Sequence, residues 1–496
     1  MSTLYTNAKL WGRSETSVLV KDGLIAQFGF EGEADQTIDL QGAHLLPGFN
    51  DAHVHIWKVG QLRTTTLDLR GIGTLPELFE AIKTRLLTLQ SGEWLYARGW
   101  NEASLAEKRP PLRTELDEVA PHNPILLTRT CAHIHAANTL AFQQAGIDAS
   151  TPNPPGGEVH YQNGLLLETA LGLIQKAMPK PSVQDYERWV LAGCDYLREQ
   201  GCTYATDPAV DPPLLQAYIN LAEQGKLPIR VNVLYIRRPD GGKDTYPLPE
   251  PYEHPFLRVK SVKFFADGGL SGATAALSVP YQNTPEPSQG VLRFDTEELY
   301  DLMLEAHLAG FQIGTHAIGD RTLTQVLGIY QRLYTEHPTD VRHRIEHFGL
   351  PDPEHLKLAH DLGVVVVPQA IFLRELRVNF ERYLPESFKA RCYNLRQMLD
   401  AGLTVALSSD GPVVKELRIL EGIKTAMHEG MLPENNISLT EAITAYTLGG
   451  AQAQQQEHLY GTLEVGKKAD FVLLSHLPAH PESQILKTIL AEEHPS

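Results

Sequence analysis

Residues 45–56 read LLPGFNDAHVHI, and this stretch carries the clearest structural signal in the 496-residue chain. An apolar run leads into Asp51, and His53 and His55 follow two positions apart. Alternate side chains of a strand project from one face, so both imidazoles can turn toward one ion. The chain has 20 histidines, so a surface pair that binds nothing is the competing interpretation, and other segments must decide.

Strand-like segments recur along the chain, with helical patterns between several of them. One helix is predicted to begin after Ser182 and to end before Gly201, and another covers about 296–309. Eight strands with intervening helices fit a (β/α)8 TIM barrel, an α/β fold, better than a doubly wound sheet. The eight strand candidates are 45–56, 203–207, 229–236, 259–266, 312–317, 343–348, 364–369 and 404–409.

The two ends of the chain contain short strands of their own. Near the N-terminus, Asp22-Gly23 marks a hairpin, and similar strand and turn chemistry returns at 461–466 and 469–474. About 150 residues separate the first two barrel strands, far more than one crossover needs. We therefore predict a small composite β-sandwich from residues 1–46 and 457–496, a barrel at 47–456, and a subdomain inserted after the first barrel strand at about 65–181.

Chemically reactive side chains are attached to five of the predicted barrel strands. His316, His347 and Asp410 stand at the ends of apolar segments, and Lys263 interrupts another. Catalytic groups converge at the carboxyl ends of barrel strands. A single histidine on an apolar strand is more often a core residue, and Lys263 alone could be a surface-directed lysine or the ion-pair partner of Asp267. Six reactive residues on five strands favour a shared site.

These segments, in this order, resemble the amidohydrolase superfamily, and specifically amidohydrolase family 3, the branch that contains N-substituted formamide deformylases. The resemblance covers nearly the whole chain. The histidine-containing segment near residue 50 is highly specific, and the lysine-containing segment assigns the branch. The matching segments are VLVKDGLI at 18–25, LPGFNDAHVH at 46–55, VKFFADG at 262–268, THAIGD at 315–320, RIEH at 344–347, SDGP at 409–412 and the closing strand pair at 461–474.

The resemblance implies a centre of two metals, a more buried α metal and a β metal. Two histidines of the first strand and one aspartate of the eighth would bind the α metal, and the aspartate would also handle the proton. Two histidines of the fifth and sixth strands would bind the β metal. A lysine of the fourth strand, carboxylated by CO2, would bridge both. In this sequence these residues are His53, His55, Asp410, His316, His347 and Lys263.

The chemistry of these side chains agrees with that assignment. An ammonium group is repelled by a cation, whereas a carbamate on Lys263 presents anionic oxygens that can span two metals. Imidazole and carboxylate ligands suit Zn²⁺ or another divalent metal, as one ion or two. Such ions make hydroxide available at neutral pH, and Asp410 can move its proton to a leaving nitrogen. We predict an amidohydrolase that cleaves a non-peptide amide C–N bond, in an N-substituted formamide or a related small amide, by attack of a metal-bound hydroxide.

Other interpretations stay open at this point. The same centre suits a lactone, ester or phosphoester hydrolase, and a relative without catalysis would be an amidohydrolase-like interaction protein. Trp100 and His133, in the inserted region, are candidates for substrate contact. A structural role is an equal alternative for His133, because Ala132 precedes it where the family usually has glycine.

The amino-acid composition limits the kinds of molecule that the protein is expected to bind. The chain has 43 Lys and Arg against 60 Asp and Glu, a net charge of −17, which argues against nucleic-acid binding because such binding depends on cations that neutralise phosphate. No apolar run of bilayer length and no signal-peptide pattern is present, and the 4 cysteines form no C-x-x-C pair. We expect a cytoplasmic protein, monomer or homo-oligomer, with a small-molecule amide substrate and no nucleic-acid or membrane partner.

Overall fold

The computed structural model describes residues 1–102, 104–129, 134–154, 157–168, 170–239, 244–284 and 286–491. The chain divides into two compact units. One combines Met1–Val59 with Tyr186–Ser496, and the other is Gly60–Asp185. Within the described ranges, no helix has both the length and the apolar character that crossing a bilayer requires.

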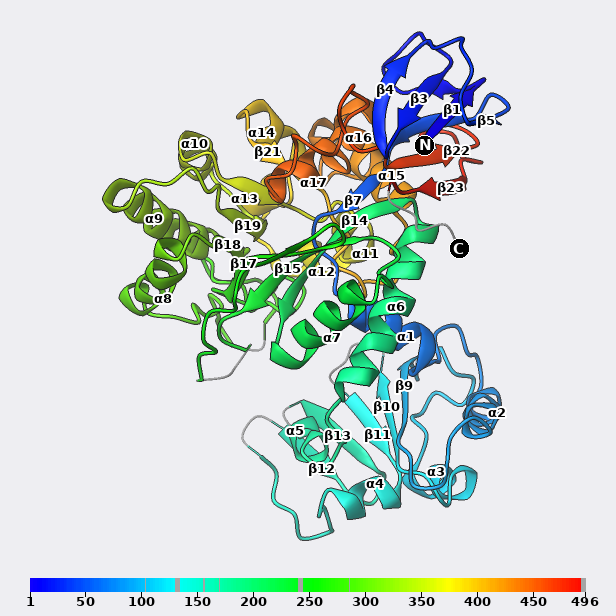
Figure 1. Ribbon diagram of the computed structural model, residues 1–496. Coiled ribbons are helices and arrows are strands. Elements are labelled where there is room, and N and C mark those ends of the chain that lie inside the picture. The colour runs from blue at the N-terminus through cyan, green and yellow to red at the C-terminus, as the bar shows by residue number, and fades with distance from the viewer. Residues whose placement is uncertain are drawn as a thin grey trace. The chain divides into compact units, whose positions relative to one another are not determined.

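The larger unit is built on eight parallel strands, which pair in the order β21-β20-β19-β18-β17-β15-β14-β7 (Figure 1). The Ala52 N–H donates to the Leu407 carbonyl, and the Asp410 N–H donates to the His53 carbonyl, so hydrogen bonds join the two edges of the sheet beyond their last paired residues. A parallel sheet joined in this way is consistent with the predicted TIM-like barrel. The strands are β7 (Phe49–Asp51), β14 (Cys202–Val210), β15 (Arg230–Ile236), β17 (Leu257–Phe265), β18 (Gln312–Ala317), β19 (Arg344–His347), β20 (Val365–Val367) and β21 (Thr404–Val405).

The barrel strands are apolar because both of their faces are covered. Every residue of β15 and of β19 is buried. Gly314 of β18 shows how tightly the space between the strands is filled, since a Cβ at this position would lie 2.3 Å from Leu234 Cδ2. The barrel is therefore a packed core, and a site can form only at its ends.

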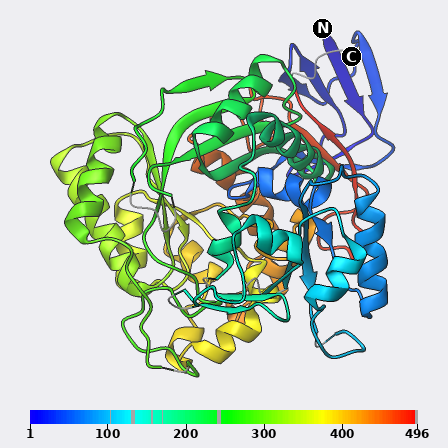
Figure 2. The ribbon, with the colours of Figure 1, turned by 90° about the horizontal axis from the view of Figure 1, so that it is seen from below.

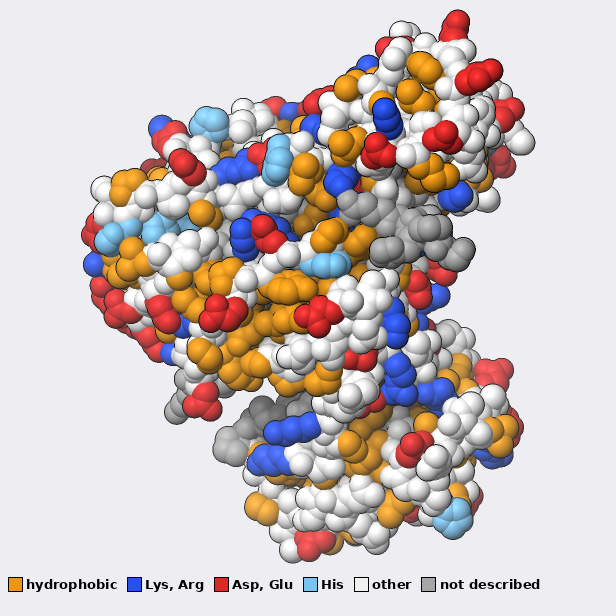
Figure 3. Space-filling model, viewed as in Figure 1, with side chains coloured by type: hydrophobic (Ala, Val, Ile, Leu, Met, Phe, Trp, Pro, Cys, Tyr) orange, Lys and Arg blue, Asp and Glu red, His pale blue; other side chains and the backbone are white. Residues whose placement is uncertain are grey.

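Helices return the chain between most of the strands. The two predicted helices are confirmed as α6 (Val183–Glu199) and α8 (Thr296–Leu308), and the side chain of Asp295 caps α8 by accepting the Glu297 N–H. Acidic side chains gather over α8 and α9 on the face shown in Figure 3. Between β15 and β17, the described residues form the short β16 (Tyr252–His254) and no helix. The other helices of this unit after α6 are α7 (Pro212–Glu223), α9 (Asp320–Glu336), α10 (Pro353–Asp361), α11 (Phe372–Glu375), α12 (Arg377–Tyr383), α13 (Glu386–Lys389), α14 (Leu395–Asp400), α15 (Ile419–His428), α16 (Leu439–Ala445) and α17 (Leu448–Ala453).

Two four-stranded sheets contain the ends of the chain. The first has the order β4-β3-β1-β5 and the second β2-β6-β22-β23. Because β22 pairs antiparallel with β6, residues from both ends share one sheet, and Figures 1 and 2 show the red C-terminal strands beside the blue N-terminal ones. The strands are β1 (Ser2–Thr6), β2 (Lys9–Leu10), β3 (Val18–Lys21), β4 (Leu24–Phe28), β5 (Gln36–Asp39), β6 (His44–Pro47), β22 (Phe471–Leu474) and β23 (Ile485–Ile489).

The turns at these ends confirm one prediction from the sequence and contradict another. The predicted hairpin is confirmed between β3 and β4, where Asp22 and Gly23 have φ angles of 50° and 74°, the left-handed values that a tight hairpin turn requires. The prediction of a strand at 461–466 is wrong, because Gly461 and Gly466 have φ angles of 93° and 91° and the segment forms turns. Besides β6, the strand that pairs antiparallel with β22 is β23.

The smaller unit has a sheet and a core of its own. Its six strands pair in the order β12-β13-β11-β10-β9-β8, and its apolar core includes Leu78, Trp100 and Leu127. The strands are β8 (Leu67–Asp68), β9 (Leu95–Trp100), β10 (Ile125–Arg129), β11 (Ile134–Ala137), β12 (Gly157–His160) and β13 (Leu165–Glu168), and the helices are α2 (Leu75–Leu86), α3 (Arg113–Val119), α4 (Thr139–Gln144) and α5 (Leu171–Gln175). Helix α1 (Ile56–Thr64) begins in the larger unit and ends in the smaller one.

Candidate metal centre

The six predicted ligand residues all lie in the larger unit, at the carboxyl ends of five barrel strands. Parallel strands end at one rim of a barrel, so these side chains share that rim. Their positions are after β7 for His53 and His55, near the end of β17 for Lys263, at the ends of β18 and β19 for His316 and His347, and after β21 for Asp410.

Three of these side chains converge on one point. Asp410 Oδ1 lies 3.5 Å from His53 Nε2 and 3.4 Å from His55 Nε2. One ligand atom from each of the three residues lies within 4.8 Å of the other two, and all three residues are buried. These atoms are close enough to hold a single ion among them.

The remaining two histidines extend this group. The ring centres of His53 and His347 are 5.0 Å apart, and those of His347 and His316 are 4.4 Å apart. The imidazoles from the first, sixth and fifth barrel strands therefore lie next to one another. The structure brings together all four histidines that the sequence singled out.

Lys263, near the end of β17, is fully buried. Its Nζ is buried and has no hydrogen-bond partner among the described residues, and burial lowers the pKa of its amine to about 8 although Glu346 and Asp410 oppose that shift. The two alternatives for this residue fail. Lys263 does not face solvent, and Asp267 is occupied elsewhere, because its carboxylate accepts hydrogen bonds from the backbone of Ile318 and Gly319.

Hydrogen bonding fixes which nitrogen of His53 is available. His53 Nδ1 lies 2.5 Å from Glu346 Oε2, and burial together with the charge of Lys263 lowers the pKa of His53, so the ring is neutral and carries its proton on Nδ1. The bare Nε2 then faces the Asp410 carboxylate across 3.5 Å. Two electron-rich atoms in this relation repel each other unless a cation lies between them.

The protonation states of the site are those of metal ligands. Burial lowers the pKa of His55 to about 4, and burial together with His316 lowers the pKa of His347 well below its ordinary value. Burial by itself would raise the pKa of Asp410, but the neighbouring imidazoles of His55 and His53 lower it overall. Neutral imidazoles around an ionised carboxylate fit a divalent cation.

The backbone is strained where two of these residues leave their strands. His347 and Asp410 have φ angles of 73° and 52°, in the left-handed region that residues with a Cβ rarely adopt. Such conformations cost on the order of 1–3 kcal/mol each and are concentrated at functional sites. The left-handed conformation at His347 also ends β19. Within that strand the side chains alternate between two faces, so Arg344 and Glu346 occupy positions on one face.

Sequence reasoning missed the side chains that orient the histidines. Glu346 contacts His53, and Gln369 Oε1 lies 2.7 Å from His347 Nδ1. Arg344 donates to Glu346 at 2.5 Å and 2.9 Å. One signal was available, because Arg344 and Glu346 are charged residues at alternate positions of a short strand.

The two predicted substrate contacts lie outside this group of residues. Trp100 belongs to the smaller unit, where its side chain is buried and its Nε1 donates to the Leu127 carbonyl at 3.3 Å, so its contact with substrate stays a prediction. His133 lies outside the residues that the structure describes.

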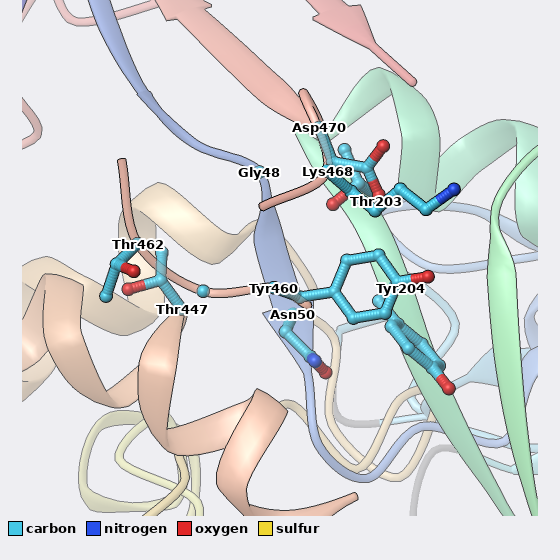
Figure 4. Close-up of a pocket in the computed structure, with 10 residues that line it drawn as sticks. Gly48, Asn50, Thr203, Tyr204, Thr447, Tyr460, Thr462, Lys468 and Asp470 are labelled. Carbon is cyan, nitrogen blue, oxygen red and sulfur yellow. The ribbon is translucent and has the colours of Figure 1, made fainter. Parts of the chain in front are cut away.

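A separate small pocket lies where β7 and β14 begin, away from the carboxyl ends of these strands. It is lined by residues that include Asn50, Tyr204, Tyr460 and Lys468, and it contains none of the predicted ligands (Figure 4). The Asn50 side-chain amide bonds to that of Gln454, donating at 2.9 Å and accepting at 3.1 Å. These bonds join β7 to the residue that follows α17.

Comparison with solved structures identifies the fold first. Two structures titled as uncharacterized metal-dependent hydrolases, from Pyrococcus horikoshii OT3 and Pyrococcus furiosus, both match with a TM-score of 0.82. Each match covers 97% of this chain and at least 98% of the other, at 22% and 23% identity. At that identity the likeness establishes the fold alone, which this chain shares with both structures.

Sequence comparison then identifies the family. The model of the amidohydrolase family Amidohydro_3 matches residues 36–493. YtcJ of Bacillus subtilis (strain 168), which is named as an amidohydrolase, is 30% identical over 96% of this chain and 93% of its own length. The N-substituted formamide deformylase of Arthrobacter pascens is 27% identical over 95% of this chain and 93% of its own. The chain belongs to the amidohydrolase family, which confirms the predicted family and the predicted class of enzyme, a hydrolase of C–N bonds.

Proposed function

We propose that this metal-dependent amidohydrolase cleaves the C–N bond of a small non-peptide amide, in an N-substituted formamide or a related compound. The observation that carries the proposal is the convergence of His53, His55 and Asp410 within 4.8 Å. The deformylase relative supports the substrate class, because the match extends over 95% of this chain.

The proposed ligands follow from the positions of the side chains. His53, His55 and Asp410 would hold one divalent ion, and His316 and His347 a second, with Zn²⁺ the ion that suits these donors best. A divalent ion bound there lowers the pKa of water and polarises a carbonyl group.

Lys263 would join the two ligand sets as a carbamate. Its Nζ first loses one proton to become a neutral amine, then forms a bond to the carbon of CO2 and releases a second proton to solvent. The loss of two protons in all converts a buried cation into a buried anion. The absence of any described hydrogen-bond partner for Nζ supports this modification, because a buried amine without a hydrogen bond is costly in its charged form.

Asp410 would carry out the proton transfers. Its carboxylate is ionised, so it can take the proton of the attacking water. The same carboxylate would then give that proton to the nitrogen that leaves as the C–N bond breaks. Glu346 and Gln369 keep the imidazoles in the orientation that this geometry requires.

One experiment tests both the metal and the substrate. We expect the purified protein to bind one to two equivalents of divalent metal, and to hydrolyse N-substituted formamides faster than N-acyl amino acids, cyclic amides, lactones and phosphotriesters. Less than about one-tenth of an equivalent of metal, not increased by Zn²⁺ with bicarbonate, would favour a non-catalytic interaction protein. Activity confined to lactones or phosphotriesters would replace the amide by those substrates.

The finer organisation of the chain and its location belong to the same proposal. We propose that the two terminal sheets form a composite sandwich from residues 1–46 and 457–496. The edge-to-face packing of Tyr5 and Phe471, whose ring centres are 6.1 Å apart, supports this. The inserted subdomain, at about 65–181, lies within the compact unit Gly60–Asp185. The free, buried thiols of Cys194, Cys202 and Cys392 suit the reducing cytoplasm.

A further inference from the structure

The imidazoles of the proposed metal centre are oriented by unequal partners, and we infer that this inequality makes the α position the tighter of two metal sites. The inference rests on the proposed function. His53, an α ligand, contacts the carboxylate of Glu346 at 2.5 Å. On the β side the hydrogen-bond partners are neutral oxygens, the Gln369 amide at 2.7 Å for His347 and the Gly268 carbonyl at 2.9 Å for His316. The Asp267 carboxylate lies farther from His316, at 3.4 Å.

The carboxylate on the α side is held in its charged form by a second residue. Glu346 is fully buried, and the Arg344 guanidinium donates two hydrogen bonds to it at 2.5 Å and 2.9 Å. Arg344 also donates to the carbonyl of Ala52 at 2.6 Å, the residue just before His53. One arginine thus fixes both the carboxylate and the backbone that carries the metal-facing histidine.

The partner on the β side has a similar geometry but no charge. The amide nitrogen of Gln369 donates to the Val367 carbonyl and to Ser408 Oγ, both at 2.9 Å. These bonds leave Oε1 as the atom that accepts from His347 Nδ1. Both histidines therefore present Nε2 to the proposed metals, and their orienting oxygens differ in charge.

This difference in charge has a direct effect on metal affinity. A carboxylate that accepts the Nδ1 proton makes the opposite nitrogen more basic, and losing such an outer partner typically costs about 10–100-fold in metal affinity. A neutral amide or carbonyl polarises the ring less. The α position also has Asp410 as a ligand, so the ligand count and the orienting charge both favour filling α before β.

The variant Glu346→Gln isolates the effect of charge, because it gives His53 the same amide partner that His347 has. Co²⁺ is titrated into metal-free, full-length protein in bicarbonate buffer, with competing chelators and calorimetry to resolve each step. We expect two steps in the wild type. In the variant, the dissociation constant of the tight step should rise about 10–100-fold, with the weak step changed less than about threefold.

Two further variants keep the test decisive. Because Glu346→Gln leaves Arg344 without its anionic partner, the double variant Arg344→Gln with Glu346→Gln removes both buried charges and should show the same selective loss. The matched control Gln369→Leu should weaken only the second step, by less than about tenfold. A merely structural role of Glu346 would weaken both steps together.

The outcomes separate this inference from the proposed function. Absence of Co²⁺ binding in the wild type would overturn the proposed metal centre itself. Two equal affinities in the wild type, or a tight step unmoved in both glutamine variants, would overturn the inference and leave the metal centre in place.

Discussion

Both ends of the barrel bury polar side chains, but the examples at the two ends differ in their hydrogen bonding. Near the amino ends of the strands, Arg230 donates to Asp470 at 2.8 Å, and both residues are buried. At the carboxyl ends, Lys263 Nζ and Asp410 Oδ1 are equally buried and make no hydrogen bond within the described structure. Buried polar groups are normally paired, so these two unpaired groups of the predicted ligand set are candidates for contact with a ligand or a reacting group.

This contrast distinguishes stability from function within one fold. Pairing at the amino ends stabilises the barrel and its contact with the C-terminal strands, because Asp470 directly precedes β22. At the carboxyl ends, unpaired groups and a strained backbone are costs that the rest of the fold must offset. Substitutions at the carboxyl ends should therefore change activity, and those at the amino ends should change the free energy of unfolding.

The largest effect is expected for Asp410→Asn. An amide has nearly the same shape as the carboxylate but cannot accept the proton of water, so kcat should fall about 10²–10⁴-fold. Steady-state kinetics on the preferred amide measure this, with circular dichroism and metal analysis as controls for fold and occupancy. Turnover near the wild-type value would assign proton transfer to another residue.

Lys263→Ala should remove most of the activity and most of one metal equivalent, because the bridge between the two ligand sets is lost. Acetate should restore part of both, since a free carboxylate can occupy the space of the carbamate. The matched control is Lys260→Ala, a partly exposed lysine of the same strand that pairs with Glu253 at 2.7 Å. Full activity and full metal content without acetate would show that Lys263 does not bridge.

Much of this functional end could be predicted from the sequence. The bounds of β18 agree with the predicted strand, because its apolar run lies between Gly310 and Gly319, which interrupt regular structure on both sides. The predicted strand at 45–56 is too long, because β7 ends at Asp51 and both histidines follow it. The side chains of His53, His55 and Asp410 nevertheless converge as predicted. Local patterns were sufficient where a ligand follows directly from a strand.

The orienting partners could not be predicted, because they depend on contacts between distant parts of the chain. Glu346 meets His53 across 293 positions, and the contact is set by the curvature of the sheet and the register of its strands. β21 is also shorter than predicted, because residues beyond Val405 bond to the segment after β7 outside a regular ladder. Neither feature has a signature in one segment alone.

At the amino ends, Asp470→Asn should destabilise the fold without affecting catalysis. It leaves Arg230 buried beside a neutral amide, and breaking a buried ion pair typically costs about 3–5 kcal/mol. Urea unfolding measures this loss, and kcat and metal content at 25 °C should stay within about twofold of the wild type. A large loss of activity in folded protein would show that the two ends are coupled.

A smaller effect, with a defined pH dependence, is expected at the buried pair His307 and His343. His343 Nδ1 accepts the Ile313 N–H at 3.2 Å, so its proton lies on Nε2, which donates to His307 Nδ1 at 2.8 Å. A second proton on His343 would oppose the Ile313 N–H. Burial, with His307, accordingly lowers the pKa of His343 to about 3.

Because this folded-state pKa is below the unfolded value of about 6.5, the stability that neutral His343 contributes is complete above pH 6.5 and is lost as the pH falls toward 3. From pH 7 to pH 5 the loss should be about 2 kcal/mol. His343→Gln keeps an acceptor and a donor but does not titrate. The difference between the free energies of unfolding of wild type and variant should therefore be about 2 kcal/mol smaller at pH 5 than at pH 7. Urea unfolding of metal-free protein at both pH values measures the change. A difference between the two proteins that does not vary with pH would mean that His343 is protonated equally in the folded and unfolded states.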